Sequence, residues 1–333
     1  MRAAQGSTPA EIDDRADAVR ARPHSTVLLV LGSLFGCGMT QSVSDAAAPD
    51  ASLADVFTPT DTGSAADGGA HYGAPRRVGT LPSAILPETS GIVASRGQPG
   101  VFWVENDSGN PADVFAIDAT GLRLATVHIA SASNVDWEDI SIDRRAGVEE
   151  LYIIDAGDNL ARTSDGAMGR ASIQIYRLSE PNASAGDATL TAERFDFTYP
   201  ARPYDCEATF VDHGTGDVYF VTKESPPAQI FVARAPLDAT ASTLLTHVGT
   251  IDLGIATAAD MSTDGARIAV RGYATVRVYP VLAGRDIAAS LAGPFLTAMP
   301  AAAAEAIAFE AGGYGLYTVA EGDAAPLFYL PAE

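Results

Sequence analysis

The sequence is short of positive charge. Its 333 residues include 21 Lys and Arg against 42 Asp and Glu, which gives a formal net charge of −21. Lys223 is the only lysine in the chain. Because nucleic acids and anionic membrane surfaces are bound through clustered basic residues, this composition argues against both as charge-based partners. The excess of acid is compatible with cation binding, or simply with the solubility of an exported protein.

Cysteine and histidine are also scarce. The five histidines are scattered without zinc-ligand spacing, so a zinc site is not expected. The only cysteines are Cys37 and Cys206, and we expect Cys206 to be a small core residue. The sequence also lacks the serine motifs G-x-S-x-G and S-x-x-K and a phosphate-binding glycine loop, which argues against covalent catalysis.

The apolar run near the N-terminus, residues 26–35, is too short to span a bilayer, but it follows three arginines as an export signal does. Its end, Leu-Phe-Gly-Cys, resembles the lipobox of bacterial lipoproteins. The resemblance implies a signal peptide over residues 1–36 and a lipid anchor on Cys37, which would leave Cys206 without a disulfide partner. Gly38 implies an outer-membrane lipoprotein, exposed to the periplasm or the cell surface. An ordinary secretory signal or a buried helix is the alternative.

Residues 37–75 predict a disordered tether. They consist mainly of Ala, Asp, Ser, Thr, Gly and Pro, with few aromatic residues. Such a segment cannot bury enough apolar surface to offset the entropy lost on ordering. The folded domain is therefore expected over residues 76–333, and we expect it to be a monomer.

Five repeats account for most of that domain. Short apolar runs alternate with turns, and each repeat offers four candidate strands except the last, which offers three. The equivalent positions are Ser90, Glu138, Glu207, Ala259 and Glu305. They are 48, 69, 52 and 46 residues apart, and one four-stranded propeller blade needs about 40 to 50. The long second interval indicates a loop insertion around residues 161–170.

The missing strand of the last repeat has a candidate at the start of the domain. Residues 76–82, RRVGTLP, form a run without a partner of their own. An N-terminal strand that completes the last blade closes a propeller and protects its edges. The sequence therefore predicts an all-β fold, a five-bladed β-propeller closed by an N-terminal strand. Six blades remain an alternative if the second or third repeat hides a degenerate one.

Acidic residues open the first strand of most repeats, although Asp and Glu are disfavoured in strands. The candidate metal ligands are Glu88, Asp136, Glu138, Asp139, Asp205, Glu207, Asp260 and Glu305. First strands line the central channel of a propeller, so we expect these acids to meet at one mouth of the channel. Clustered carboxylates repel one another unless a cation lies among them, and oxygen ligands suit Ca²⁺.

The second strands end in a further set of polar residues. These residues are Glu105, Asn106, Asp107, Asp155, Asp158, Asn159, Lys223, Glu224, Arg271 and Glu321. Lys223 and Arg271 are the candidate catalytic residues, because cations beside a metal can hold a phosphate or carboxylate. Turn chemistry and salt bridges are the alternative explanation for such strand ends.

The motifs NDSG, DWEDI, GDN, DCEA and AEAIAF resemble those of bacterial exported β-propeller lipoproteins without an assigned function. The acid-x-acid strand of Asp205 and Glu207, with Glu224, is similar to the calcium sites of β-propeller phytases, although Lys223 and five repeats depart from that pattern. Five blades also resemble calcium-activated nucleotidases, and gluconolactonase-like propellers are a weaker match. These resemblances imply a calcium-dependent phosphoric ester hydrolase that binds a small anionic ligand. The alternative is a non-catalytic binding or scaffold propeller.

Overall fold

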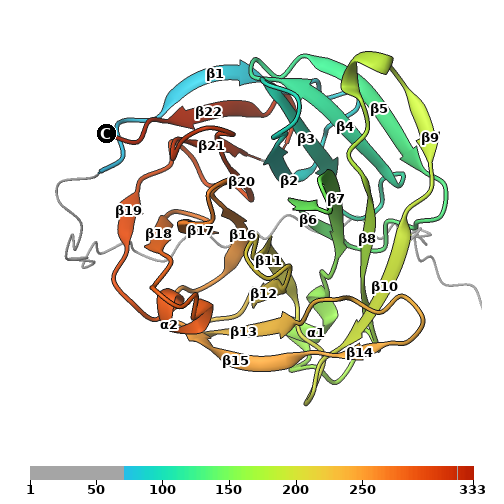
Figure 1. The fold of residues 1–333 in the computed structure, drawn as a ribbon, viewed down its shortest axis with the longest axis vertical. Coiled ribbons are helices and arrows are strands. Elements are labelled where there is room, and N and C mark those ends of the chain that lie inside the picture. Colours follow the sequence, from blue (N-terminus) through green and yellow to red (C-terminus); the bar gives the residue numbers. More distant parts are fainter. Residues whose placement is uncertain (1–70, 321) are drawn as a thin grey trace, which may run out of the picture. The chain divides into compact units, whose positions relative to one another are not determined.

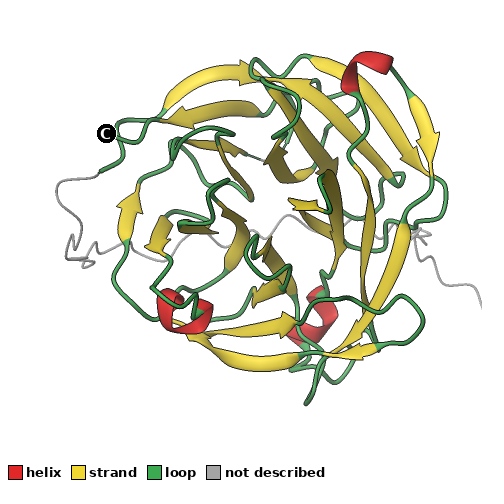
Figure 2. Cartoon of the chain, in the orientation of Figure 1, coloured by secondary structure: helices red, strands yellow, loops and turns green. Residues whose placement is uncertain are grey.

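Five mainly antiparallel sheets surround a common axis in the computed structural model, which describes residues 71–320 and 322–333 (Figure 1). Residues 1–70, with the predicted signal peptide, Cys37 and most of the predicted tether, lie outside the described residues. Helices are few and short, and nearly all regular structure is strand (Figure 2). None of the helices in the described part is long and apolar enough to cross a membrane.

Each sheet is one blade, and its first strand lies nearest the axis (Figure 1). Blade 1 contains β2 (Thr89–Ala94), β3 (Val101–Asn106), β4 (Asp113–Asp118), β5 (Arg123–Ile129) and β9 (Ala188–Leu190). Blade 2 contains β6 (Trp137–Arg145), β7 (Val148–Asp155), β8 (Ile173–Ser179), β10 (Glu193–Thr198) and β14 (Thr243–Leu244). Blade 3 contains β11 (Cys206–Val211), β12 (Val218–Thr222), β13 (Ala228–Ala233) and β15 (Thr246–Ile251).

The remaining two blades complete the ring. Blade 4 contains β16 (Ala256–Met261), β17 (Arg267–Gly272), β18 (Val276–Pro280) and β19 (Leu296–Ala298). Blade 5 contains β20 (Ala306–Phe309), β21 (Leu316–Val319), β22 (Pro326–Leu330) and β1 (Arg76–Thr80). The helices are α1 (Asn159–Thr163), α2 (Ile287–Leu291) and the 3₁₀ turn η1 (Ala183–Ala185).

The ring is closed by the N-terminal strand, as the sequence predicts. Strand β1 pairs antiparallel with β22, and the register runs from Arg76 opposite Tyr329 to Thr80 opposite Pro326. The blade count is five, so the six-bladed alternative is wrong. The outermost strand of blade 5 is therefore the first strand of the domain, so the two ends of the fold pair in one sheet.

Two short strands also join neighbouring blades. Strand β9, from the chain between β8 and β10, pairs parallel with β5 of blade 1. Strand β14, from the chain between β13 and β15, pairs parallel with β10 of blade 2. The long second repeat therefore has two insertions. The sequence predicts the one that contains α1, around residues 161–170, but not the one that forms η1 and β9.

The hydrophobic core lies between the blades rather than inside any one of them. Five clusters of buried residues are present, each made from two neighbouring blades. Because both faces of each blade pack against a neighbour, the inner strands β2, β11 and β16 are buried throughout. Each fully buried Leu, Ile or Phe contributes about 1.5–3 kcal/mol relative to exposure. Cys206 is fully buried in one cluster, which confirms it as a small core residue.

Candidate metal centre

The same backbone contact recurs at one end of the axis in three successive blades. The peptide N–H just beyond the second strand donates to the carbonyl of the acid that precedes the first strand. These bonds join Asp107 to Glu88 at 2.8 Å, Gly157 to Asp136 at 3.1 Å and Lys223 to Asp205 at 2.9 Å. Antiparallel pairing thus brings the start of each inner strand and the end of its partner to one place, as the sequence predicts. We call this place the acidic end.

A β-bulge falls near the start of four inner strands. The register shifts between Trp137 and Asp139 in β6 and between Cys206 and Ala208 in β11. The extra residues are Glu138 and Glu207, and β2 and β16 are also bulged near their starts. A bulge leaves one residue out of the ladder and re-aims its side chain. The bulges therefore explain how Glu138 and Glu207 are directed toward the acidic end.

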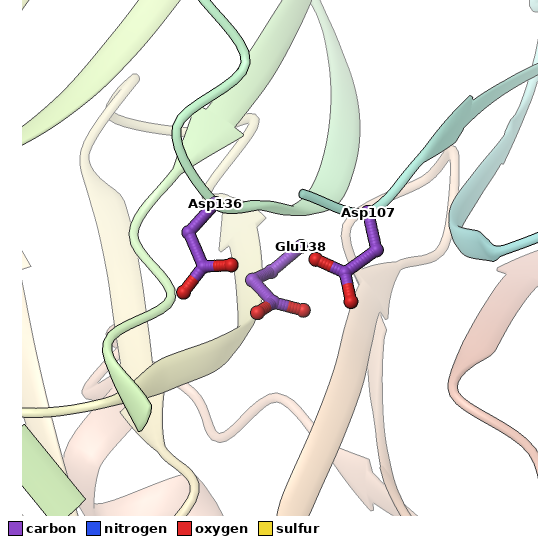
Figure 3. Close-up of side chains that lie close together, drawn as sticks. All are labelled: Asp107, Asp136 and Glu138. Atoms are coloured by element: carbon purple, nitrogen blue, oxygen red, sulfur yellow. The ribbon is translucent and has the colours of Figure 1, made fainter. Parts of the chain in front are cut away.

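The first carboxylate cluster consists of Asp107, Asp136 and Glu138. Asp107 follows β3 of blade 1, whereas Asp136 and Glu138 come from the start of β6 in blade 2. Each residue offers a carboxylate oxygen within 4.8 Å of those of the other two, and Figure 3 shows the three side chains turned toward one another. Glu138 is 2% exposed and accepts a 3.0 Å hydrogen bond from the Ser90 hydroxyl. Asp107 and Asp136 are half-buried, so solvent reaches the cluster.

Gly157 lies directly against this cluster. A Cβ atom at this position would overlap Glu138 Oε1 and lie 2.7 Å from both Cγ and Oδ2 of Asp136. Any side chain here would push the carboxylates apart, so the close packing of the cluster depends on glycine. The GDN motif, for which the sequence leaves a turn and a site role open, thus forms one wall of the candidate site.

The second cluster shares Glu138 and adds Asp205 and Glu207 of blade 3. All three side chains are buried, and their carboxylate oxygens meet the same 4.8 Å limit. Asp205 Oδ1 accepts a 2.7 Å hydrogen bond from the peptide N–H of Asp158, and its Oδ2 lies 3.2 Å from Arg162 Nε. Glu207 forms a close ion pair with Lys223 through Oε1, whereas its Oε2 has no hydrogen-bond partner in the structure.

Crowding and burial raise the pKa values of these acids. The pKa of Asp136 rises from 3.8 to about 7, first because of burial and then because of the nearby charges of Asp107 and Asp205. The positive charge of Arg170 opposes this rise without cancelling it. Burial is also the main reason why the pKa of Glu138 lies well above its ordinary value, and Glu207 adds to it. Without a further cation, these carboxyls therefore keep their protons to a higher pH than isolated acids do.

Asp139 and Asp260 have a different environment from Glu138. Asp139 Oδ2 accepts hydrogen bonds from the peptide N–H groups of Thr209 at 2.8 Å and Ala259 at 3.2 Å. Asp260 Oδ2 accepts one from the Phe309 N–H at 2.8 Å. Each carboxylate joins its inner strand to those of later blades. The structure thus places both acids in inter-strand contacts and outside the two clusters.

The other two predicted ligands also lie outside the clusters. Glu88 is exposed, and its Oε2 accepts a 2.8 Å hydrogen bond from the Asn110 side chain. Glu305 is buried, and its Oε1 lies 3.4 Å from Lys223 Nζ. Of the eight acids predicted as ligands, the structure therefore brings together Asp136, Glu138, Asp205 and Glu207 in the two clusters.

The two predicted anion-binding cations already have partners in the structure. Lys223 pairs with Glu207 and Glu305 and lies 5.3 Å from the centre of the Tyr273 ring. Arg271 is fully buried, and it donates to the backbone carbonyls of Ala304 at 2.8 Å and Ala302 at 2.9 Å. Burial lowers the pKa of Arg271 to about 9. Anion binding by Lys223 and Arg271 stays a prediction that these contacts do not favour.

Several residues of the site are not predicted as ligands by the sequence. Asp107 stands in the sequence among the polar strand ends, and its place just after β3 is the signal that relates it to the site. Arg162 and Arg170 come from the insertion that contains α1, and Arg170 lies 2.8 Å from the buried Asp155. Nothing in the sequence shows where such an insertion folds back. Glu105 is also fully buried near Gly91, and burial raises its pKa well above the ordinary value.

The fold and the site together define a five-bladed β-propeller with a cluster of buried and half-buried carboxylates at one end of its axis. No protein-family model matches the sequence, and no curated protein matches it either. Among solved structures, a chain of a nidogen/laminin complex is 12% identical, covers 70% of this chain and 72% of its own length, and has a TM-score of 0.42. A Xanthomonas campestris gluconolactonase is 15% identical, with coverages of 80% and 98% and a TM-score of 0.45. Both similarities are low, so the fold assignment rests on the strand pairing.

Proposed function

We propose that this protein binds a divalent cation, Ca²⁺, at the acidic end through Asp107, Asp136 and Glu138. The observation that carries the proposal is the approach of three carboxylates from two blades to within 4.8 Å of one another. Like charges at that separation repel one another strongly unless they are protonated or share a cation. A divalent ion would supply the missing positive charge.

The chemistry of the donor atoms favours calcium. All three side chains offer oxygen, and Ca²⁺ takes six to eight oxygen ligands in flexible geometry, including water. Asp107 and Asp136 are half-buried, which leaves room for water among the ligands. Histidine and cysteine are absent from both clusters of the described residues, so the softer transition metals have no preferred ligand there.

Such an ion would connect blades 1 and 2. Asp107 belongs to the end of β3, whereas Asp136 and Glu138 belong to the start of β6. An ion that binds only the folded ring stabilises it by about 2.7 kcal/mol when its concentration is 100 times its dissociation constant. We therefore infer that calcium would help to hold blades 1 and 2 together, whatever else the site does.

Calcium titration by calorimetry tests this function. The wild-type protein should bind one ion in the first cluster, and Asp136→Asn should weaken binding by about tenfold or more. The matched control is Asp238→Asn, because Asp238 is exposed, belongs to neither cluster and accepts hydrogen bonds from the peptide N–H and hydroxyl of Thr240. Wild-type protein that binds no calcium at millimolar concentration, or equal loss in both variants, would contradict the proposal.

Metal-assisted phosphoester hydrolysis is the reaction that such an ion would support. A bound cation can polarise a phosphoryl oxygen and lower the pKa of a bound water. The half-buried Asp107 and Asp136 support access to such an ion, whereas the ion pairs of Lys223 favour the non-catalytic binding propeller. We therefore favour the function of a non-catalytic binding propeller over that of a hydrolase. A panel of phosphoesters with and without calcium separates the two functions, because turnover lost in Asp136→Asn would establish the hydrolase.

We further propose that the protein is a monomer, held at the outer membrane by a lipid on Cys37 with the propeller in the periplasm or on the cell surface. The support is the apolar run of residues 26–35 together with the Leu-Phe-Gly-Cys sequence of residues 34–37. Metabolic labelling with a fatty acid should label the wild-type protein and not Cys37→Ser. Labelling of both proteins, or of neither, would overturn the assignment.

A further inference from the structure

Lys223 already provides a cation at the second cluster. Its side chain is buried at the end of blade 3, with 5% of the residue exposed. Its ammonium group forms ion pairs with Glu207 and with Glu305, the latter at 3.4 Å. The aromatic ring of Tyr273, 5.3 Å away, faces the same ammonium. One protein cation thus connects carboxylates from blades 3 and 5.

The second cluster has the ligand atoms of a metal site in addition to this lysine. Glu138, Asp205 and Glu207 bring carboxylate oxygens within 4.8 Å of one another. Glu207 is 2% exposed, yet its Oε2 atom has no hydrogen-bond partner in the structure. A buried carboxylate oxygen without a donor is costly unless a cation or water completes it. Without the ammonium, the cluster would therefore need another cation.

The two clusters differ in how they relate to this lysine. Among the described residues, both ion pairs of Lys223 are with Glu207 and Glu305, and neither is with Asp107 or Asp136. The lysine ammonium is a compact point charge on a long flexible stem, and it can occupy the position of a metal ion among oxygen ligands. Its charge also opposes the rise in the pKa of Asp107, but its close ion pair is with Glu207 of the second cluster.

We propose that the Lys223 ammonium acts as a built-in cation that fills the second cluster, so that the acidic end binds one divalent ion in the wild-type protein and two when the ammonium is removed. The first of these ions rests on the proposed function, whereas the second does not. Lys223 is then the residue that sets the metal stoichiometry. Glu138, which belongs to both clusters, would be shared between the two ions.

The test counts calcium ions in Lys223→Met. Methionine keeps an unbranched apolar stem as far as the Cε position and removes the charged group, whereas the control Lys223→Arg keeps the charge. The full chain is stripped with a chelator, dialysed against calcium chloride and analysed for metal per chain. We expect one ion in the wild type and in Lys223→Arg, and two in Lys223→Met. Adding Glu207→Gln to Lys223→Met should return the count to one.

The outcomes separate this inference from the proposed function. If the wild type binds no ion and Lys223→Met binds one, the proposal of a first site is wrong and the role of Lys223 is supported. One ion in both proteins would overturn the role of Lys223 and leave the first site intact. Two ions in the wild type would also overturn it, because the lysine would then exclude nothing. No ion in either protein overturns both.

If Lys223→Met does not fold, a second variant tests the same proposal. Loss of the ammonium leaves Glu207 and Glu305 buried without their counter-ion, so the variant is expected to need calcium for folding. In Lys223→Gln combined with Glu305→Gln, one of these acids is neutral and the three acids of the second cluster are intact. This double variant should still bind two ions, and a count of one would overturn the proposal.

Discussion

Oδ2 of Asp139, on the inner strand of blade 2, accepts a 2.8 Å hydrogen bond from the peptide N–H of Thr209, on the inner strand of blade 3. The same oxygen accepts a second bond, at 3.2 Å, from the Ala259 N–H on the inner strand of blade 4. One carboxylate therefore joins three blades near the axis. The acids that line the inner strands thus have two separate tasks, one in the ring itself and one at the acidic end.

We predict that Asp139→Ala destabilises the ring without changing the metal site. It removes the acceptor of three buried N–H groups, those of Thr209, Ala259 and Ile140, which should lower the free energy of unfolding by about 2–4 kcal/mol. Asp139→Asn keeps one acceptor oxygen and should lose about half as much. Denaturant unfolding measures both variants, with Asp238→Ala as the exposed control. Equal stability of Asp139→Ala and the control would show that the bonds to Thr209 and Ala259 contribute nothing.

The pH dependence of calcium binding follows from the raised pKa of Asp136. Burial and the charges of Asp107 and Asp205 raise this pKa from 3.8 to about 7, so the folded protein holds a proton that the unfolded chain releases. The stabilising effect of that proton is complete below pH 3.8 and is lost as the pH rises through about 7. Calcium must displace the same proton.

Calcium affinity should therefore rise between pH 5.5 and 7.5, by up to about tenfold per pH unit for each proton released. Calorimetry in buffers of different ionisation enthalpy counts the protons released. In the metal-free protein, stability should fall over the same pH range, and saturating calcium should weaken that fall. An affinity that does not change with pH would show that Asp136 is not a ligand.

Gly157→Ala tests whether the packing around the first cluster matters. The new methyl group would overlap Glu138 Oε1 and lie 2.7 Å from the Asp136 carboxyl carbon, so the carboxylates would have to separate. We predict a loss of calcium affinity of about tenfold or more, by comparison with the effect of disturbing groups that orient metal ligands. Gly312→Ala is the control, because nothing lies within 4 Å of a Cβ at that position. Unchanged affinity in Gly157→Ala would place the ion elsewhere.

The sequence predicts the ring well because each blade repeats one apolar pattern at a nearly constant spacing. It does not predict β9 and β14, which have three and two residues. None of their residues is buried, so they carry no apolar signal. Their pairing depends on where two insertions fold back against neighbouring blades. That information lies in tertiary contacts rather than in local pattern.

The candidate site is only partly predictable for a related reason. The spacing of the repeats brings Glu138 and Glu207 to the same place, but neighbouring acids appear equivalent to them in the sequence. The bulges in β6 and β11 separate Glu138 from Asp139. A bulge follows from backbone packing around the axis and leaves no mark in residue type. The ion pairs of Lys223 are likewise invisible until blades 3 and 5 are assembled.

The last prediction concerns Arg170, which fixes the loop that forms one wall of the site. Its Nη1 lies 2.8 Å from Asp155 Oδ1 and donates to the Gly157 carbonyl at 2.9 Å. Its Nη2 donates to the Gln174 side chain at 2.7 Å. Asp155 is fully buried, so loss of the guanidinium leaves a buried acid without its cation. Arg170→Met should therefore lower the free energy of unfolding by about 3–5 kcal/mol.

The control for Arg170→Met is Arg194→Met. Arg194 forms an ion pair with Asp196 at 2.6 Å, but their side chains are 52% and 34% exposed. Solvent screens such a pair, and its loss should change stability by about 0–1 kcal/mol. Denaturant unfolding compares the two variants. Because Arg170 also positions Gly157, its variant should bind calcium more weakly, whereas Arg194→Met should bind as the wild type does. If the two substitutions lower the free energy of unfolding equally, burial of Asp155 does not strengthen its ion pair. If they change calcium affinity equally, Arg170 does not position the site.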